Sequence, residues 1–179
     1  TQDTSFFFAT RKGMVKRSDA QLYARCRKTG IQALGLREDD ELIAVREVDD
    51  NSHVVLTTEN GMAIRFSCRD VRSMGRTATG VKGIALRRGD KVVACVTVKE
   101  DDEEATIMTV SSKGYGKRSK IDLYRIQSRG GKGVINFKVT NKTGDVIGAM
   151  TVVDSDALLL LTSNNKIIRI SVKEISSIG

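Results

Sequence analysis

The sequence contains no proline, no tryptophan, one histidine and only three cysteines in 179 residues. Because proline is absent, proline-rich linkers are excluded and the turns must be formed by Gly, Asn and Asp. The single histidine, His53, has no Cys or His near it in the sequence, so neither a metal site nor a histidine-based catalytic triad is expected. Cys26, Cys68 and Cys95 are widely spaced and form no CxxC pair, which predicts reduced and mostly buried thiols in a cytoplasmic protein.

Long apolar runs and nucleotide-binding motifs are also missing. No apolar run approaches the roughly 18 residues that a membrane-spanning helix needs, and no signal-peptide pattern opens the chain. The segment 131–133 is not a P-loop, because Gly rather than Ser or Thr follows Lys132. The segments 80–83 and 130–133 both read GxxG, the loop that KH modules use on nucleic-acid backbone, but strand-like segments flank them instead of helices. Since the acidic loops also lack the spacing of a calcium loop, we expect no catalytic residue, metal or cofactor in this chain.

The charge of the chain is strongly unbalanced. Thirty Lys and Arg stand against 22 Asp and Glu, which gives a formal net charge of +8 and an isoelectric point of about 9.6. A basic balance of this size favours a polyanionic partner, with nucleic acid first and an anionic membrane surface second. The simpler alternative is a soluble protein that is merely basic.

A repeat of about 50 residues runs along the chain. Four strand-like segments each lead into a residue that tolerates a turn, and successive turn residues are 48, 53 and 51 positions apart. An arginine follows each turn residue by four positions. The turn residues and their arginines are Gly13 with Arg17, Gly61 with Arg65, Gly114 with Arg118 and Asn165 with Arg169.

Each full copy of the repeat predicts about four short strands. The segments are 4–6 residues long and rich in Val, Ile and Thr, and after the basic segment each copy passes a glycine, at Gly30, Gly80 or Gly130. A four-stranded repeat of this length is typical of a propeller-like array of blades, and the alternative is a sandwich or barrel with accidental self-similarity. The copies number about three and a half, over residues 6–51, 53–103, 105–156 and 157–179.

Charge is sorted within each copy. Fourteen of the 22 acids lie in or beside the polar turns and the loops that close each copy, whereas the basic residues gather in the middle. In an array this would place cations along one edge of every blade, an arrangement that suits a long and curved polyanion. The repeated arginine has a second interpretation, in which it pairs with the acidic loop of a neighbouring blade.

One basic segment is especially suited to phosphate. Residues 127–133 read Gln-Ser-Arg-Gly-Gly-Lys-Gly. Glycines let backbone N–H groups approach an anion closely, while Arg and Lys supply charge and hydrogen-bond donors.

Several of these segments resemble the C-terminal domain of the bacterial DNA gyrase A subunit, the β-pinwheel. The resemblance covers nearly the whole chain and rests on residues 60–66, 71–84, 114–118 and 129–135. It implies an all-β, propeller-like pinwheel that binds double-stranded DNA on its basic rim and wraps it without catalysing a reaction itself. The implied partners are the gyrase B subunit, together with the rest of the A chain, in an A2B2 holoenzyme that would use ATP and Mg on other domains.

The phosphate contacts expected under this resemblance read backbone and not bases, so curvature would be the main source of sequence preference. They come from the repeated arginines and from basic residues of neighbouring segments. These residues are Arg17, Arg65, Arg76, Lys82, Lys117, Arg118, Arg129, Lys132 and Arg169.

Two features depart from the family pattern. The family's box reads Gln-Arg-Arg-Gly-Gly-Lys-Gly in its first blade, whereas here Ser128 replaces an arginine and the run falls in the fifth blade by order. The chain therefore resembles blades three to five with the start of the sixth. This leaves open the equivalent domain of topoisomerase IV, which wraps DNA less, and a propeller that contacts proteins through its acidic loops.

Overall fold

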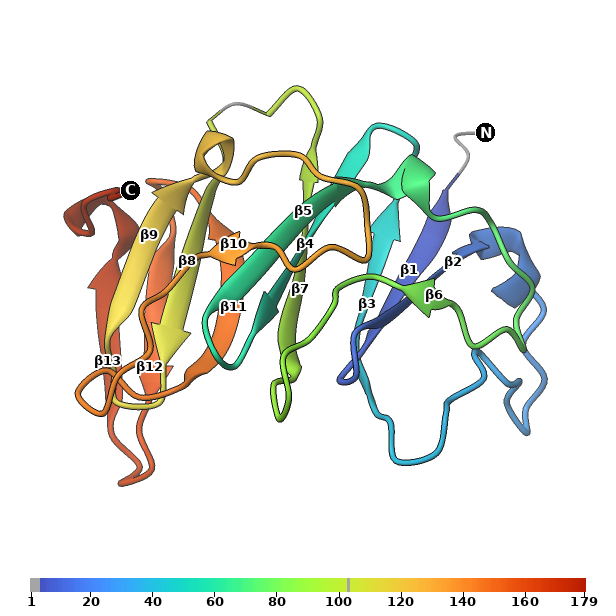
Figure 1. The fold of residues 1–179 in the computed structure, drawn as a ribbon, viewed down its shortest axis with the longest axis horizontal. Coiled ribbons are helices and arrows are strands. Elements are labelled where there is room, and N and C mark those ends of the chain that lie inside the picture. The colour runs from blue at the N-terminus through green and yellow to red at the C-terminus, as the bar shows by residue number, and fades with distance from the viewer. Residues whose placement is uncertain (1–3, 103) are drawn as a thin grey trace.

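The computed structural model describes residues 4–102 and 104–179, and this part of the chain is all-β (Figure 1). Its helical segments are four 3-10 turns, of which η1 is the longest with four residues. None of them is long or apolar enough to cross a membrane. The elements are β1 (Ser5–Thr10), β2 (Met14–Asp19), η1 (Ala20–Tyr23), β3 (Leu42–Val48), β4 (Ser52–Thr58), β5 (Met62–Ser67), η2 (Cys68–Asp70), β6 (Val81–Lys82), β7 (Val92–Lys99), β8 (Thr106–Ser111), β9 (Gly116–Lys120), η3 (Ile121–Leu123), β10 (Val134–Ile135), β11 (Val146–Val152), β12 (Ala157–Leu161), β13 (Ile167–Ser171) and η4 (Val172–Glu174).

The strands form four antiparallel sheets, and neighbouring repeats exchange strands. The first sheet has the order β3-β1-β2-β6 and the second has the order β10-β5-β4-β7. In both sheets, one edge strand comes from the following repeat. Strand β6 of the second repeat pairs with β2 of the first, and β10 of the third repeat pairs with β5 of the second. The third sheet is β11-β8-β9 and the fourth is β12-β13. The all-β pinwheel prediction is confirmed, but a blade is not one contiguous repeat.

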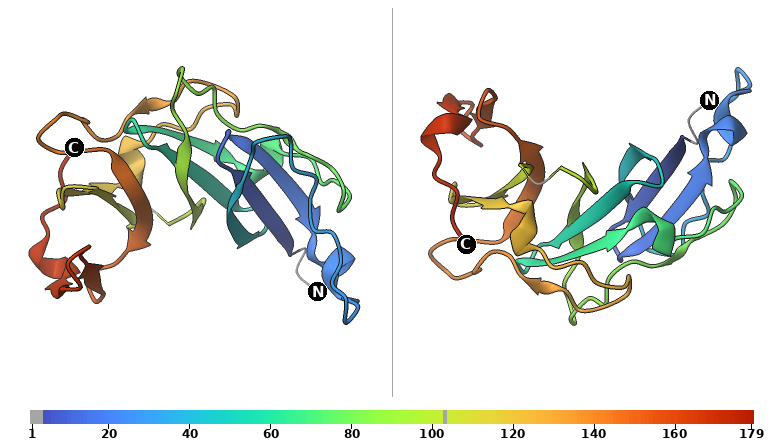
Figure 2. Two further views of the ribbon diagram at one scale, coloured as in Figure 1. Left: turned by 90° about the horizontal axis from the view of Figure 1, so that it is seen from below. Right: turned by 90° about the horizontal axis from the view of Figure 1, so that it is seen from above.

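The sheets stack face to face along an arc (Figure 2). Strand β4 shows why this stacking is stable, since all seven of its residues are buried. Val54 and Leu56 pack in the core that the first and second sheets share, while Val55 faces the opposite way, toward Ile107 of the third sheet. A strand that is buried on both faces reads as a continuous apolar run, as β4 does.

The cores between sheets also hold two of the cysteines. Cys68 and Cys95 are fully buried in the core between the first two sheets, and burial raises the pKa of both thiols to about 12. Cys26 is exposed. The prediction of buried thiols is therefore confirmed for two of the three cysteines.

Two glycines make the strand exchange possible. Gly80 and Gly133 both have positive φ, at +88° and +78°, and each lies directly against the backbone of the strand it joins. A methyl group on Gly80 would overlap the carbonyl oxygen of Val15, and one on Gly133 would overlap that of Ala63. The structural counterpart of Gly80 is therefore Gly133 and not Gly130, so the sequence alignment of this glycine was wrong by three positions in the third copy.

We predict that Gly80→Ala lowers the free energy of unfolding by about 2 kcal/mol or more, because it adds a backbone clash to the cost of a left-handed conformation. Gly89→Ala is the matched control, since Gly89 has φ +78° but no atom within 4 Å of the added methyl. Urea unfolding followed by circular dichroism measures both variants. Equal losses in the two variants would contradict the role given to Gly80.

Candidate nucleic-acid interface

The repeated arginine joins one repeat to the next through hydrogen bonds of its guanidinium group; we call this set of contacts the arginine clasp. The Arg65 side chain is buried, with 7% of its surface exposed, and its Nη1 donates to the carbonyl oxygen of Ile121 at 3.1 Å. In the next repeat, Nη1 of Arg118 donates to the carbonyl oxygens of Val172 and Ile175, each at 3.3 Å. Ile121 begins η3 and Val172 begins η4, so each arginine crosses a joint between sheets to the 3-10 turn of the following repeat.

A second contact fixes the guanidinium from the same sheet. The Nε group donates to the residue twelve positions earlier: Ser5 Oγ at 3.3 Å from Arg17, and Thr106 Oγ1 at 3.0 Å from Arg118. Arg17 also pairs with Asp50, and Arg118 pairs with Asp154 at 2.5 Å. Both acids lie in the loops that close their repeats. The structure thus pairs these two arginines with the acidic loop of their own repeat, and not with that of a neighbouring blade as the second interpretation had it.

The arginine backbone takes part in the same joint. Isolated parallel bridges join Arg17 to Ser73, Arg65 to Ile126 and Arg118 to Ser177, and in each case the partner belongs to the following repeat. Arg17, Arg65 and Arg118 therefore direct their polar groups into the protein, and contact between them and DNA stays a prediction. Arg169 differs, since its side chain is exposed and the residue twelve positions earlier is Ala157, which has no side-chain acceptor.

His53 completes the clasp of the second repeat. Its Nδ1 lies 3.2 Å from Nε and 2.9 Å from Nη2 of Arg65. Because a guanidinium can only donate, Nδ1 is the acceptor and the proton of the neutral ring sits on Nε2. Burial, and then the charge of Arg65, lower the pKa of His53 below its ordinary value. In this structure the histidine is an acceptor for the guanidinium of Arg65.

We define the outer edge of the molecule as residues 20–37, 71–89 and 123–144. Backbone hydrogen bonds join its segments from one repeat to the next. The amide of Gly130 donates to the carbonyl oxygen of Gly83 at 2.6 Å, and Ala85 donates to Gly131 at 2.8 Å. The corresponding bond between the first two repeats runs from Gly35 to Ala78 at 3.1 Å. The run 127–133 therefore uses much of its backbone to hold neighbouring repeats together.

Arginine side chains add further hydrogen bonds between neighbouring repeats. Arg129 donates from Nη1 to the carbonyl oxygen of Lys82 at 3.1 Å and from Nε to that of Asp70 at 2.9 Å. Arg76 occupies the corresponding place one repeat earlier and reaches the carbonyl oxygen of Gln32 at 3.4 Å. Both guanidinium groups remain partly exposed, so these two residues join repeats and also present positive charge to solvent.

Two lysines lie three positions after a turn residue, and Lys16 is buried while Lys117 is half-buried. Lys117 donates to the carbonyl oxygen of Asn136 at 3.0 Å, and burial lowers the pKa of its ammonium. Lys16 was not predicted as a site residue, yet it is 1% exposed and donates to Ala33 at 2.7 Å and to Arg76 at 2.6 Å. Its position, equivalent to that of Lys117, was the signal in the sequence that could have found it.

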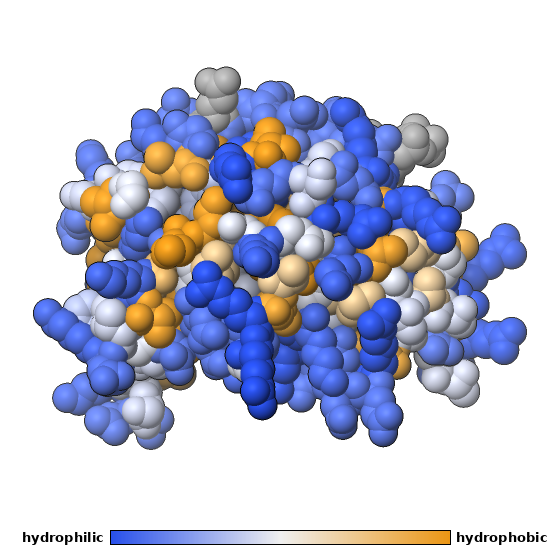
Figure 3. Space-filling model, viewed as in Figure 1, coloured by the Kyte–Doolittle hydropathy of each residue, from blue (hydrophilic) through white to orange (hydrophobic). Residues whose placement is uncertain are grey.

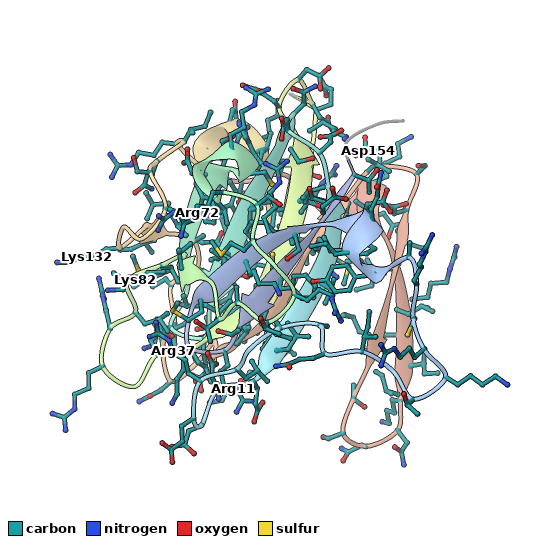
Figure 4. The ribbon with its side chains drawn as sticks, turned by 90° about the vertical axis from the view of Figure 1, so that its right-hand side faces the viewer. Arg11, Arg37, Arg72, Lys82, Lys132 and Asp154 are labelled. Carbon is teal, nitrogen blue, oxygen red and sulfur yellow. The ribbon has the colours of Figure 1, made fainter. Side chains whose placement is uncertain are left out.

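The remaining predicted residues, Lys82 and Lys132, are exposed and project from the same side of the outer edge, with Arg72 beside them (Figure 4). This edge lies on the convex side of the arc (Figure 2) and carries no Asp or Glu in any of its three segments. The space-filling view shows hydrophilic side chains around a central apolar band (Figure 3). Ile126 and Ile135 of the outer edge are both exposed. The cations of the outer edge are Arg25, Arg27, Lys28, Arg37, Arg72, Arg76, Lys82, Arg87, Arg88, Arg125, Arg129, Lys132, Lys138 and Lys142.

One group of acidic residues lies at the end of the sheets where β3, β7 and β11 finish. Asp49 and Asp50 follow β3, residues 100–102 and 104 follow β7, and Asp154 and Asp156 follow β11. Lys99 pairs with Asp49 in this region, and the hydrogen bond from Lys99 lowers the pKa of the Asp49 carboxyl. Asp154 lies far from Lys82 and Lys132 in Figure 4. This group of acids is thus separated in space from the exposed lysines of the outer edge, whereas the acids at 38–41, Asp90 and Asp145 lie directly before β3, β7 and β11, at the opposite end of the sheets.

These features define a class of protein: a propeller-like array whose blades exchange strands and whose convex edge is basic and free of acids. The family model for the DNA gyrase C-terminal domain, beta-propeller, matches residues 4–49, 52–99, 105–152 and 156–179. The chain therefore belongs to the family of DNA gyrase C-terminal domains.

Individual relatives agree with this assignment. The DNA gyrase A protein of Lawsonia intracellularis is 67% identical over 99% of this chain, and that of Haloquadratum walsbyi is 43% identical over the same share. The chain spans about a fifth of the length of these relatives, at 22% and 21%. Among solved structures, the C-terminal domain of DNA topoisomerase IV matches 98% of this chain with a TM-score of 0.90, and a DNA gyrase A C-terminal domain matches 100% with 0.87. Both are 28% identical to this chain, which covers 54% and 59% of them.

We predict that Arg65→Met lowers the free energy of unfolding by about 2–4 kcal/mol, since it leaves the Ile121 carbonyl and His53 Nδ1 buried without their donor. Arg169→Met should change it by less than about 0.5 kcal/mol, because that side chain is exposed. Chemical denaturation of both variants gives the comparison. A similar, small change in the free energy of unfolding of both variants would show that the arginine clasp does not stabilise the protein.

A second prediction concerns pH. The pKa of His53 is depressed in the folded protein, so below pH 6.5 the unfolded chain binds a proton that the folded chain does not bind. The contribution of His53 to stability is therefore complete above about pH 6.5 and falls as the pH drops from there toward the folded pKa. His53→Asn places an acceptor oxygen near the position of Nδ1 and should flatten this dependence, as measured by melting temperatures between pH 7.5 and 5. Parallel curves for the two proteins would show that His53 is not responsible.

Proposed function

We propose that this chain is a non-catalytic module that binds and bends double-stranded DNA within a DNA gyrase A subunit. The observation that carries the proposal is the outer edge: fourteen cations and no acid on the convex side of a curved array. A positive, curved surface lets successive repeats contact the phosphates of one bent duplex, and binding releases the counterions of those phosphates.

The outer edge favours backbone contact over base reading. Lys82 and Lys132 present flexible ammonium groups, which act as point charges for phosphate. The edge carries no helix that could enter a major groove, since its only regular elements in the described residues are the short strands β6 and β10 and the 3-10 turns. Affinity should therefore depend on salt and on how easily the duplex bends.

The gyrase assignment rests on sequence, because the structural matches to the gyrase and topoisomerase IV domains are about equally good. The curated relatives at 67% and 43% identity are gyrase A proteins. In the whole enzyme, a type II topoisomerase, we propose that this module works beside the other domains of the A chain, together with the gyrase B subunit. There its DNA wrapping would support ATP-dependent negative supercoiling in the bacterial cytoplasm, at the nucleoid.

The proposal predicts that the double variant Lys82→Gln/Lys132→Gln binds duplex DNA more weakly, whatever the sequence of the duplex. Removing two phosphate contacts should reduce the slope of log K against log salt by about 1.8. The matched control is Lys99→Gln/Lys166→Gln, which removes the same charge outside the outer edge. Fluorescence anisotropy on two unrelated duplexes across a salt series measures all three proteins.

Two results would contradict the proposal. Equal losses in the test and control variants would mean that only net charge matters and that the outer edge is not the contact surface. A loss restricted to one of the two sequences would mean that the module reads bases.

A further inference from the structure

A cleft of about 800 Å³ lies on the outer edge where the first repeat meets the second. It is bounded by η1 and residues 24–32 of the first repeat and by Arg76 and Thr77 of the second. Three of its lining side chains are arginines, namely Arg25, Arg27 and Arg76, and no lining residue is acidic. The cleft therefore joins guanidinium groups from two different repeats around one open space.

The joint between the second and third repeats has an arginine–carbonyl contact that the first joint lacks. There, Arg129 lies across the corresponding position and donates to two carbonyl oxygens, those of Asp70 and Lys82. At the first joint, Arg76 has the single long bond to Gln32 at 3.4 Å, and the residue equivalent to Asp70 is Leu22, which lines the cleft. The second joint is closed by its arginine, whereas the first is open beside its arginine.

A buried ammonium group adds further positive charge at the first joint. The buried Lys16 ammonium donates to the carbonyl oxygens of Ala33, Gly75 and Arg76, and so ties the loop that carries Arg76 to the first repeat. Burial first and the charge of Arg76 second lower the pKa of Lys16. In the second repeat this position is Ile64, so the first joint alone of these two has a buried ammonium beside its arginine.

We propose that this cleft is a phosphate site, in which a phosphate group bridges Arg25 or Arg27 of the first repeat and Arg76 of the second. Guanidinium groups suit this role because they bind phosphate oxygens in a bidentate geometry. The bound phosphate replaces the carbonyl contact that Arg76 lacks and fixes the angle between the two repeats. The inference rests on the proposed function in taking duplex DNA as the source of the phosphate.

The first arm of the test uses inorganic pyrophosphate as the probe. At about ten times its Kd, pyrophosphate should raise the melting temperature of the 179-residue chain by about 3–6 °C over sodium chloride of equal ionic strength. Arg25→Gln/Arg27→Gln should lose this shift, and Arg87→Gln/Arg88→Gln, with the same charge but outside the cleft, should keep it. No shift in the parent chain, or equal shifts in both variants, would overturn the site.

The second arm uses a duplex and a double-mutant cycle. If one DNA phosphate bridges the two repeats, Arg25→Gln/Arg27→Gln and Arg76→Gln should each lower the salt slope by about 0.9 but together lower it by little more. Additive losses would overturn a shared phosphate. A pyrophosphate shift that depends on the cleft, with an unchanged DNA slope, would overturn the duplex as the source and assign the cleft to a small phosphate compound.

The two arms separate this inference from the proposed function. If the chain binds no duplex at all, the proposed function fails, and the pyrophosphate arm still decides whether the cleft holds phosphate. If the chain binds duplex with a steep salt slope that the cleft variants do not change, the proposed function stands and the inference fails.

Discussion

The buried arginine at each joint is the interaction on which the rest of the structure depends. A guanidinium has five N–H donors in a rigid plane, so one side chain can hold its own sheet, the closing loop and the 3-10 turn of the next repeat at fixed angles. Arg65 and Arg118 reach the 3-10 turn of the next repeat with hydrogen bonds that cross 56 and 54 positions of sequence, and Arg118 also pairs with Asp154 of its closing loop. Since the backbone bridge from this arginine to the following repeat recurs at three successive joints, the sheets follow an arc, and the arc gives the outer edge its curvature.

The exchange of strands serves the same end. Because β6 and β10 belong to the repeat that follows, each of these two strands also connects neighbouring blades. Backbone bonds from Gly35, Ala85 and Gly130 extend this connection along the convex side. The backbone of the outer edge is thereby fixed, while side chains such as Lys82 and Lys132 remain exposed. A rigid surface with free cations is what backbone recognition of a duplex requires.

Much of this could be predicted from the sequence, because the strands are amphipathic or buried and the turns are marked by Gly and Asn. The exchange of strands could not, since β6 and β10 have two residues each and carry no periodic pattern. The register of Gly133 was missed because Gly130 stands at a similar distance in the sequence, and only the pairing with Ala63 distinguishes them. Sequence also could not separate arginines that bind protein from those free to bind phosphate, since Arg65 and Arg169 occupy the same position in their repeats.

The central claim is that several repeats contact one curved duplex. The most direct measurement compares the salt dependence of binding for a duplex of about 20 base pairs with that for one of about 150, using the same chain. Each phosphate neutralised contributes about −0.9 to the slope of log K against log salt. The account predicts a steeper slope for the long duplex, because more repeats reach it as it bends. Equal slopes for both lengths, or no binding, would contradict it.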